Sequence, residues 1–458
     1  MNLLLSLQEI VGAENVLTGD DVRSRFVSWI DQGPCQALAI VRPGSTGQVS
    51  RVLAACHAAG QAVVPMGGLT GLVRGCVAGP GEIGLSLERM HRVESVDPVN
   101  RTMTLEAGVP LQVVQQEAER HGLLYPVDFG ARGSAHIGGS VATNAGGNGV
   151  IRYGMTRDSV LGLEAVLADG TVISAMNRMI KNNAAYDLKQ LFIGSEGTLG
   201  VVTRLVLRLR EAPRSNQTAM VACTGFGDVT QLLKHMDAAL GGSLVAFEVM
   251  WNEFYRLVTT PPAKGTPPVG QEYPYYVLLE SSGGDSGRDQ AHFEEALGEA
   301  IEAGLVADAV VASSEAQRET LWALRDDVEM FFRIGMPVTF DISLPVTEME
   351  AYVAEVLARL EREWPEYQRF VFGHLGDGNL HIIAAGPPSR AARHGIEQCV
   401  YEPLAARGGS VSAEHGIGRE KQPWLALSRS AAELDLMRRI KAALDPKGIL
   451  NPGRVLPA

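Results

Sequence analysis

The chain has 458 residues, of which 46% are hydrophobic and 20% charged, and its formal net charge at pH 7 is −12. This acidic balance disfavours a general nucleic-acid binder or a binder of anionic membranes. No stretch approaches the ~18 consecutive apolar residues of a membrane span. The five cysteines are widely spaced and include no CxxC pair. Neither a disulfide framework nor a thiolate zinc site is therefore expected, and a reducing, cytoplasmic location fits best.

The first part of the chain predicts an α/β region. The N-terminal MNLLLSLQEIVG is typical of a short amphipathic helix rather than an export signal, because it lacks a basic start. Residues 37–210 then alternate short apolar runs with helical periods, beginning with ALAIVRP, QVSRVLAACHAAG and QAVVPMGG, the order of βαβ packing. The alternating strand VVTRLVLRLR closes this region, and the polar EAPRSNQ predicts a boundary near Pro213.

The middle of the chain predicts a separate α+β unit. TAMVACTGF, YYVLLES and PVTFDISLP have the composition of strands, and two long helical stretches separate the last two. A helix is expected over residues 431–444. The sequence therefore divides into segments 1–212, 213–410 and 411–458.

Three glycine-rich segments occur in the first half of the chain. PMGGLTGL follows a strand directly, and its bare backbone suits an anion, although an ordinary tight turn is an equal interpretation of this segment alone. GSAHIGGSVATNAGGNG holds six glycines in seventeen residues, and its Ile137 and Val141 indicate packing rather than a surface loop. IGSEGTLGVVT has the same character. Together the three segments predict a large, phosphate-bearing cofactor.

The sequence GHLGDGNLHI places His374 and His381 close together in the chain. Its glycines make a helix improbable, so a strand, a turn and a second strand that begins at His381 are expected. Two histidines with Glu414 of AEHGIG form a candidate metal site with open positions. From these residues alone, turn histidines bonded to backbone carbonyls are the commoner interpretation.

These segments form a specific combination. PMGGLTGL, DFGARGSAHIGGSVATNAGGNGVIRYG, LKQLFIGSEGTLGVVT, GHLGDGNLH, EHGIG and LDPKGILNPGRVL, in this order, closely resemble the flavin-dependent D-2-hydroxy acid dehydrogenases of the vanillyl-alcohol oxidase/PCMH superfamily. The resemblance implies an α+β protein. Residues 1–212 would be a PCMH-type FAD-binding domain of two α/β subdomains. Residues 213–410 would be a substrate or cap domain with an antiparallel sheet and the metal-ligand histidines, and residues 411–458 would return to the FAD domain.

The resemblance also implies how FAD is bound. Members that hold FAD covalently attach it through His or Cys, which PMGGLTGL lacks, so non-covalent binding is expected. The residues that would contact the cofactor are Pro65, Gly67, Gly68, Leu69, Thr70, Gly71, Leu72, Gly133, Ser134, Gly138, Gly139, Thr143, Asn144, Gly147, Glu196, Gly197, Val201 and Asn451.

For the chemistry, the resemblance assigns Zn²⁺ or a similar divalent ion to His374, His381 and Glu414. A metal on the substrate hydroxyl would lower the hydroxyl pKa, and His415 would take the proton as hydride passes from C2 to N5 of FAD. A histidine that only orients Glu414 is the alternative. Asn379 is the remaining member of the expected catalytic set.

Arg325 of LWALRDD lies where the family keeps its substrate arginine and would bind the C1 carboxylate at two points. Pairing with neighbouring acids on a solvated helix face is equally compatible with the local sequence. Members specialised for D-2-hydroxyglutarate have a threonine, a lysine and an asparagine where this chain has Glu329, Thr339 and Ile383. These differences favour D-lactate or a larger apolar acid such as D-mandelate over the alternative substrate, D-2-hydroxyglutarate.

Two interpretations from other classes stay open. One is a zinc hydrolase with structural glycine loops, and the other is a non-catalytic flavin-binding subunit of an electron-relay complex. For the dehydrogenase, the expected electron acceptor is an electron-transfer flavoprotein, a quinone or a cytochrome. No nucleic-acid partner is expected, and a homodimer is among the expected assemblies.

Overall fold

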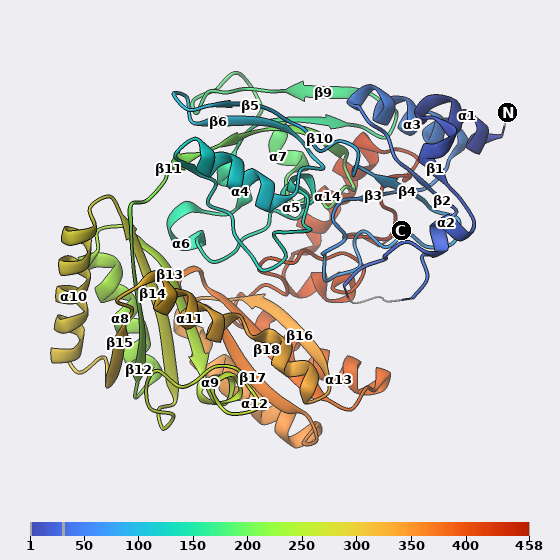
Figure 1. The fold of residues 1–458 in the computed structure, drawn as a ribbon. Coiled ribbons are helices and arrows are strands. Elements are labelled where there is room, and N and C mark those ends of the chain that lie inside the picture. Colours follow the sequence, from blue (N-terminus) through green and yellow to red (C-terminus); the bar gives the residue numbers. More distant parts are fainter. Residues whose placement is uncertain (1, 30–32, 458) are drawn as a thin grey trace. The chain divides into compact units, whose positions relative to one another are not determined.

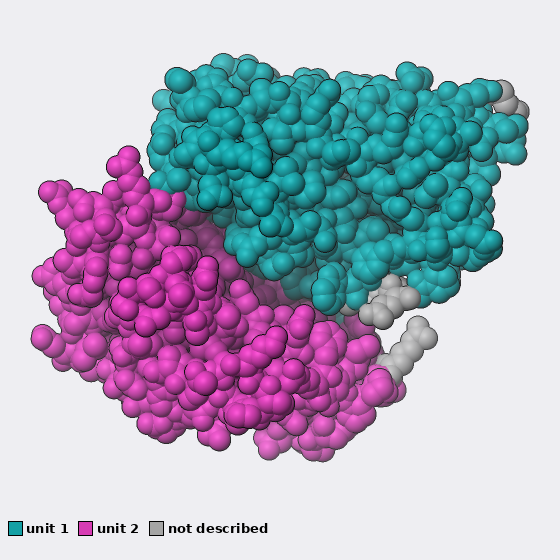
Figure 2. Space-filling view, in the orientation of Figure 1, with its two compact units in different colours: residues 1–147, 154–212, 414–458 teal, residues 148–153, 213–413 magenta. Residues whose placement is uncertain are grey.

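The computed structural model describes residues 2–29 and 33–457. The chain divides into two compact units (Figure 1 and Figure 2). Unit 1 comprises residues 1–147, 154–212 and 414–458, and unit 2 comprises residues 148–153 and 213–413. The short segment 148–153, which lies within a glycine-rich stretch, carries no sequence signal for its place in unit 2.

Unit 1 begins with a small sheet that follows the predicted βαβ order. The strands lie in the order β1 (Val16–Leu17), β2 (Ala39–Val41), β4 (Ile83–Ser86) and β3 (Val63–Met66), and β4 is parallel to both β2 and β3. The helices of this part are α1 (Leu3–Val11), α2 (Asp20–Arg23) and α3 (Thr46–Ala59). The Ser45 side chain accepts a hydrogen bond from Gln48 N at the start of α3, and Gly60 ends the helix at φ 65°. The predicted helices α1 and α3 are confirmed.

The second sheet of unit 1 is antiparallel. Its order is β5 (Val93–Asp97), β6 (Thr102–Glu106), β10 (Val201–Arg208), β8 (Val160–Val166) and β9 (Val172–Ala175). The remaining elements of this part are α4 (Leu111–Arg120), β7 (Leu123–Leu124), α5 (Ile137–Thr143), the 3₁₀ segment η2 (Thr156–Ser159), α7 (Lys189–Phe192) and β11 (Arg210–Glu211). The central strand β10 is the predicted strand VVTRLVLRLR.

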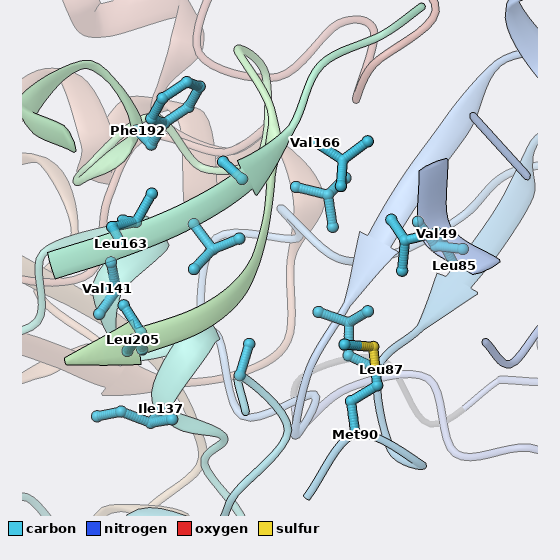
Figure 3. Packing of buried hydrophobic residues seen from close by; sticks show 14 of the residues in the cluster. Val49, Leu85, Leu87, Met90, Ile137, Val141, Leu163, Val166, Phe192 and Leu205 are labelled. Carbon is cyan, nitrogen blue, oxygen red and sulfur yellow. The ribbon is translucent and has the colours of Figure 1, made fainter. Parts of the chain in front are cut away.

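One cluster of buried apolar side chains extends through both sheets of unit 1 (Figure 3). Val49 and Leu85 from the first sheet region belong to it, as do Ile137 and Val141 of α5 and Leu205 of β10. Fully burying a side chain of this size contributes ~1.5–3 kcal/mol. Because α5 is anchored by two such residues, the glycine-rich segment that contains it is held in place, as its apolar residues predicted.

The end of the chain returns to unit 1, as expected. The helix α14 (Ala431–Leu444) has the predicted bounds. After it, Val63 N donates to Ile449 O at 2.8 Å and Asn451 N donates to Val63 O at 2.8 Å. The last part of the chain thus pairs with β3, the strand that leads into PMGGLTGL.

Unit 2 is built on a seven-stranded sheet in which neighbouring strands are antiparallel. The order is β15 (Asp308–Val311), β12 (Ser215–Cys223), β14 (Tyr275–Gly283), β13 (Leu244–Trp251), β17 (Gln368–His374), β18 (Asn379–Gly386) and β16 (Met336–Ser343). The helices of unit 2 are α6 (Val150–Tyr153), α8 (Phe226–Ala239), α9 (Asn252–Thr259), α10 (Ser286–Glu302), α11 (Glu315–Asp326), α12 (Met349–Glu363) and α13 (Arg390–Ala405).

One face of this sheet is covered by α9, α11 and the 3₁₀ segment η3 (Val328–Arg333). Phe254 of α9 stacks on Phe372 of β17 with ring centroids 4.2 Å apart, and Leu324 of α11 belongs to the same buried cluster. Because side chains alternate across a strand, Phe372 and every second residue of β17 point to this face. The residues paired with them on the neighbouring strands point to the same face. This face carries the polar residues of the candidate site in unit 2.

Candidate active site

The segment PMGGLTGL leaves β3 at Met66 and lies against the second glycine-rich segment. A Cβ added to Gly68 would stand 1.8 Å from Ser134 O and 3.0 Å from the Cα of Ala135, so only glycine fits here. Leu69 adopts φ 58°, a left-handed conformation that turns the chain. The close approach of the two backbones therefore explains the glycine at position 68.

The second segment contains the helix α5, which the sequence did not predict as a helix. Gly138 N donates to Ala107 O at 2.8 Å, and a Cβ on Gly138 would stand 2.6 Å from the Cβ of Ala107. Asn144 ends α5 at φ 51°, and its Oδ1 accepts a hydrogen bond from Arg157 N at 2.9 Å. Glycine lets α5 pack directly on the strand ends of the second sheet.

These segments enclose a cavity of about 350 Å³ within unit 1. Fourteen of the eighteen expected cofactor residues line it, namely Pro65, Gly67, Gly68, Leu69, Thr70, Gly71, Leu72, Gly138, Gly139, Thr143, Glu196, Gly197, Val201 and Asn451. Glu414 and His415 also belong to its lining. The cavity thus brings together glycines from all three segments with two of the residues expected to carry the chemistry.

Gly133, Ser134, Asn144 and Gly147 are not among the lining residues. Ser134 O instead supports Gly68, and Asn144 caps α5, as described above. Gly147 has φ 128°, and a Cβ on it would stand 2.0 Å from Asp128 O. Ser134, Asn144 and Gly147 therefore support the wall of the cavity through their packing and hydrogen bonds.

The cavity lining also includes residues to which sequence reasoning gave no role. Cys76 and His136 are among them, and both belong to residue types that can attach a flavin. Burial raises the pKa of the Cys76 thiol to about 11, and burial lowers the pKa of His136. Neither residue lies in PMGGLTGL, so the motif alone could not bring them to the cavity.

Glu196 and Asn451 fix the position of the EHGIG segment in unit 1. Glu196 Oε1 accepts a hydrogen bond from Ile417 N at 2.7 Å, and Oε2 accepts one from Gly418 N at 2.8 Å. Asn451 Nδ2 donates to Glu196 O at 2.7 Å. Burial raises the pKa of Glu196 against these hydrogen bonds. Glu414 Oε1 in turn accepts a hydrogen bond from Gly147 N at 2.9 Å, so the start of this segment is held as well.

In unit 2, Arg325 lies at the end of α11 and is only 7% exposed. Its Nε donates to Glu248 Oε2 at 2.9 Å, whereas its Nη1 lies 3.4 Å from Asp326 Oδ1. The solvated helix face that the local sequence allowed is therefore wrong for Arg325. A buried arginine needs a carboxylate partner, and Glu248 of β13 supplies it.

Glu248 also contacts the first histidine. His374 ends β17 opposite Glu248 in the strand register, and its Nδ1 lies 2.7 Å from Glu248 Oε1. His374 Nε2 lies 3.0 Å from Arg325 Nη2. Burial alone would raise the pKa of Glu248, but His374 and Arg325 together lower it to about 2. No sequence pattern pointed to Glu248, which lies in the strand β13 and far from both partners along the chain.

The two histidines come together across a turn, as predicted. The short segment η5 (Leu375–Asp377) and Gly378 at φ 84° reverse the chain, and β18 begins at Asn379, two residues before the expected His381. The rings of His374 and His381 have centroids 5.4 Å apart. They share one face of the sheet because His381 pairs with Phe372, two residues before His374.

Asp341 and Asn379 lie on the same face. Asp341 of β16 is fully buried and pairs with His381 in the register, and its Oδ2 accepts a hydrogen bond from Ala413 N at 3.2 Å. Asn379 is 3% exposed, and neither Oδ1 nor Nδ2 of its side chain has a hydrogen-bond partner among the described residues. A buried, unpaired carboxamide is costly in a folded protein, so both side-chain atoms of Asn379 are available to a water or a ligand.

The three positions expected around the substrate tail differ in exposure. Glu329 of η3 and Thr339 of β16 are exposed. Ile383 pairs with Thr339 in the register but is only 4% exposed and packs in the aromatic cluster with Phe370 and Phe331. The apolar character of Ile383 is therefore explained by the core of unit 2.

Comparison with known proteins identifies the family. Residues 212–455 match the FAD linked oxidases, C-terminal domain, and residues 37–175 match an FAD binding domain. The chain is 41% identical to a mitochondrial D-2-hydroxyglutarate dehydrogenase of Bos taurus over 99% of this chain and 83% of that protein. The chain belongs to the FAD-linked oxidase family. A D-2-hydroxyglutarate dehydrogenase of Xanthomonas citri pv. viticola is 39% identical over 99% of this chain and 96% of that protein.

Solved structures of this FAD-linked oxidase fold agree with the architecture. An alkyldihydroxyacetonephosphate synthase has a TM-score of 0.77 at 16% identity, covering 98% of this chain and 84% of the synthase. A p-cresol methylhydroxylase has a TM-score of 0.76 at 15% identity, covering 99% of this chain and 96% of the hydroxylase.

The predicted resemblance and fold class are thus confirmed. This FAD-linked oxidase is an FAD-dependent oxidoreductase that acts on a CH–OH group. The zinc hydrolase interpretation is therefore rejected. Among the residues that the structure describes, no helix is both long and apolar enough to cross a membrane.

Proposed function

We propose that this FAD-linked oxidase oxidises D-2-hydroxyglutarate to 2-oxoglutarate. The observation that carries the proposal is the identity of about 40% to D-2-hydroxyglutarate dehydrogenases over nearly the whole chain. The expected preference for D-lactate or D-mandelate rested partly on Ile383, whose apolar side chain belongs to the core of unit 2. D-lactate remains the second candidate, because Thr339 stands where a lysine would neutralise a distal carboxylate and is exposed on the sheet.

The cavity in unit 1 suits FAD. Gly71 and Gly139 line it, and a Cβ on either residue would meet no atom of the described residues within 4 Å. Bare backbone at these positions lets N–H groups approach a pyrophosphate or a ring closely. FAD bound there would accept the C2 hydride at N5. The protein supplies the orientation of the cofactor and keeps the EHGIG segment beside it through Glu196.

We further propose that His374, His381 and Glu414 hold Zn²⁺ or a similar divalent ion. Two imidazoles and a carboxylate are the donor set of a catalytic site with an open position. Ala413 N is hydrogen-bonded to Asp341, the ladder partner of His381, and Glu414 is the next residue along the chain. A metal in this set would lower the pKa of the substrate hydroxyl.

The chain's own side chains have three tasks in this reaction. Arg325 binds the C1 carboxylate through its planar guanidinium. His415 takes the hydroxyl proton as the C2–H bond breaks. Asn379, whose carboxamide has no partner among the described residues, donates and accepts hydrogen bonds at the substrate.

We propose an electron-transfer flavoprotein, a quinone or a cytochrome as the physiological electron acceptor. A cytoplasmic location remains a prediction from cysteine usage, and a homodimer remains a prediction as well.

Anaerobic reduction of the bound flavin by single 2-hydroxy acids tests the function. D-2-Hydroxyglutarate should bleach the flavin faster than D-lactate or D-mandelate, and the L enantiomers should leave it oxidised. Faster bleaching by D-lactate would favour the second candidate. A flavin that no D-2-hydroxy acid reduces would contradict both and would support a non-catalytic electron-relay subunit.

A further inference from the structure

Glu248 contacts two residues of the proposed mechanism and has no assigned role in it. It lies on β13, is fully buried, and faces His374 across the ladder between β13 and β17. One of its oxygens contacts His374 Nδ1 and the other accepts a hydrogen bond from Arg325 Nε. A single carboxylate therefore joins a histidine at the end of a strand to an arginine at the end of a helix.

The three contacts among these side chains are consistent with one arrangement of hydrogens. A carboxylate only accepts hydrogen bonds, so the 2.7 Å contact requires a hydrogen on His374 Nδ1. A guanidinium only donates, so the 3.0 Å contact between Arg325 Nη2 and His374 Nε2 requires a lone pair on Nε2. Both conditions describe the same neutral tautomer, in which Nε2 is the basic nitrogen.

We propose that Glu248 is a positioning residue that sets the tautomer of His374 and the orientation of Arg325 at the same time. The inference rests on the proposed function, in which His374 is a metal ligand and Arg325 binds the C1 carboxylate. With Nδ1 carrying the hydrogen, the lone pair on His374 Nε2 that accepts the hydrogen bond from Arg325 is the one that a metal would use, so metal binding would replace that hydrogen bond. With its Nε edge bound to Glu248, Arg325 binds a carboxylate through Nη1 and Nη2.

This role requires a carboxylate with the length of glutamate. An amide at position 248 accepts hydrogen bonds on its oxygen alone, so Glu248→Gln can satisfy either His374 Nδ1–H or Arg325 Nε–H but not both. If the amide nitrogen faces His374, the hydrogen of the imidazole moves to Nε2 and the ligand lone pair is lost. If the amide nitrogen faces Arg325, two donors meet and the guanidinium is displaced.

Glu280 provides a matched control in the same sheet and against the same helix. It lies on β14, is also buried, and accepts hydrogen bonds from Arg318 Nε at 2.7 Å and Arg318 Nη2 at 2.9 Å. Arg318 belongs to α11, like Arg325. Glu280→Gln therefore breaks a buried Glu–Arg pair of similar burial that includes no histidine.

The test compares FAD-loaded wild type, Glu248→Gln and Glu280→Gln in two binding measurements. Competition with a chelator gives the dissociation constant for Zn²⁺, and the change in flavin absorbance on titration with 2-oxoglutarate gives that of a carboxylate product. Glu248→Gln should weaken Zn²⁺ binding by about 10- to 100-fold, the usual effect of removing a partner that orients a ligand histidine. It should also weaken 2-oxoglutarate binding, whereas Glu280→Gln should leave both constants within about twofold while lowering thermal stability.

Wild-type Zn²⁺ and 2-oxoglutarate constants in Glu248→Gln would overturn the inference. If that variant does not fold, the imidazole ¹⁵N chemical shifts of His374 in the wild type show which ring nitrogen carries the hydrogen. The His374 signal is assigned by its loss in His374→Gln. A hydrogen on Nδ1 supports the inference and a hydrogen on Nε2 overturns it. A wild type that holds no metal and is reduced by no D-2-hydroxy acid would instead refute the proposed function, so the two hypotheses fail separately.

Discussion

Gly68 and Ser134 lie in backbone contact, although they come from different glycine-rich segments. A Cβ on Gly68 would stand 1.8 Å from Ser134 O, well inside any tolerable separation. This contact joins the turn after β3 to the segment that leads into α5. The wall of the cavity in unit 1 depends on the absence of a side chain at this position.

We expect Gly68→Ala to destabilise unit 1 even without cofactor. Separating the two backbones should cost about 1–3 kcal/mol, the range for overpacking, and should lower the unfolding midpoint of FAD-free protein by several degrees. Gly71→Ala is the control, because a Cβ there would meet no atom of the described residues within 4 Å. Equal midpoints for the two variants in a thermal-shift assay would contradict this account.

We expect FAD to be released from the denatured protein by acid or heat. Cys76 and His136 line the cavity, but the raised pKa of the Cys76 thiol keeps the reactive thiolate scarce at neutral pH. After acid precipitation, the flavin absorbance should appear in the supernatant. Flavin fluorescence that stays with the denatured chain on a gel would refute non-covalent binding, and Cys76→Ala would then identify or exclude the attachment residue.

We expect His374→Ala and His381→Ala to lose bound Zn²⁺ and turnover while they keep FAD. Both histidines lie in unit 2, whereas the lining of the cavity consists of unit 1 residues. Elemental analysis and flavin absorbance give the two stoichiometries on one sample. His394→Ala, at an exposed position of α13, should retain both. Full turnover in a metal-free preparation would exclude a catalytic metal.

We expect His415→Ala to keep most of its metal but to lose kcat by about 10² to 10⁴, the usual contribution of a positioned acid–base group. The measurement is single-turnover reduction of the flavin, which separates the chemical step from reoxidation. A variant that loses metal in proportion to its rate would show instead that His415 serves to orient Glu414.

We expect the substrate tail to respond to charge near β16. Arg333 ends η3, which packs on β16, and Thr339 is exposed on that strand. A second carboxylate without a cationic partner costs several kcal/mol to desolvate. Arg333→Gln should therefore raise KM for D-2-hydroxyglutarate about 10-fold but leave that for D-lactate unchanged, and Thr339→Lys should lower KM for D-2-hydroxyglutarate. If KM changed in parallel for both acids, the distal part of the substrate would not bind near β16.

The sequence predicted those features that depend on local pattern. Periodic apolar residues gave α3 and α14, alternation gave β10, and clustered glycines indicated the cavity. The helix α5 escaped prediction because its glycines disfavour a helix locally, and packing of Ile137 and Val141 against the core outweighs that preference. Glu248 could not be found from sequence, since it lies 126 residues from His374 and has no motif of its own.

The pairing of Val63 with Ile449 and Asn451 joins two parts of unit 1 that are separated along the chain by the whole of unit 2. Asn451 lines the cofactor cavity, so part of the cavity wall comes from a segment that is synthesised after unit 2. The nascent chain therefore lacks part of the cavity wall until this segment has been synthesised and has paired with β3. A complete cofactor cavity therefore forms only after unit 2 has been synthesised, although every residue of the cavity lining belongs to unit 1.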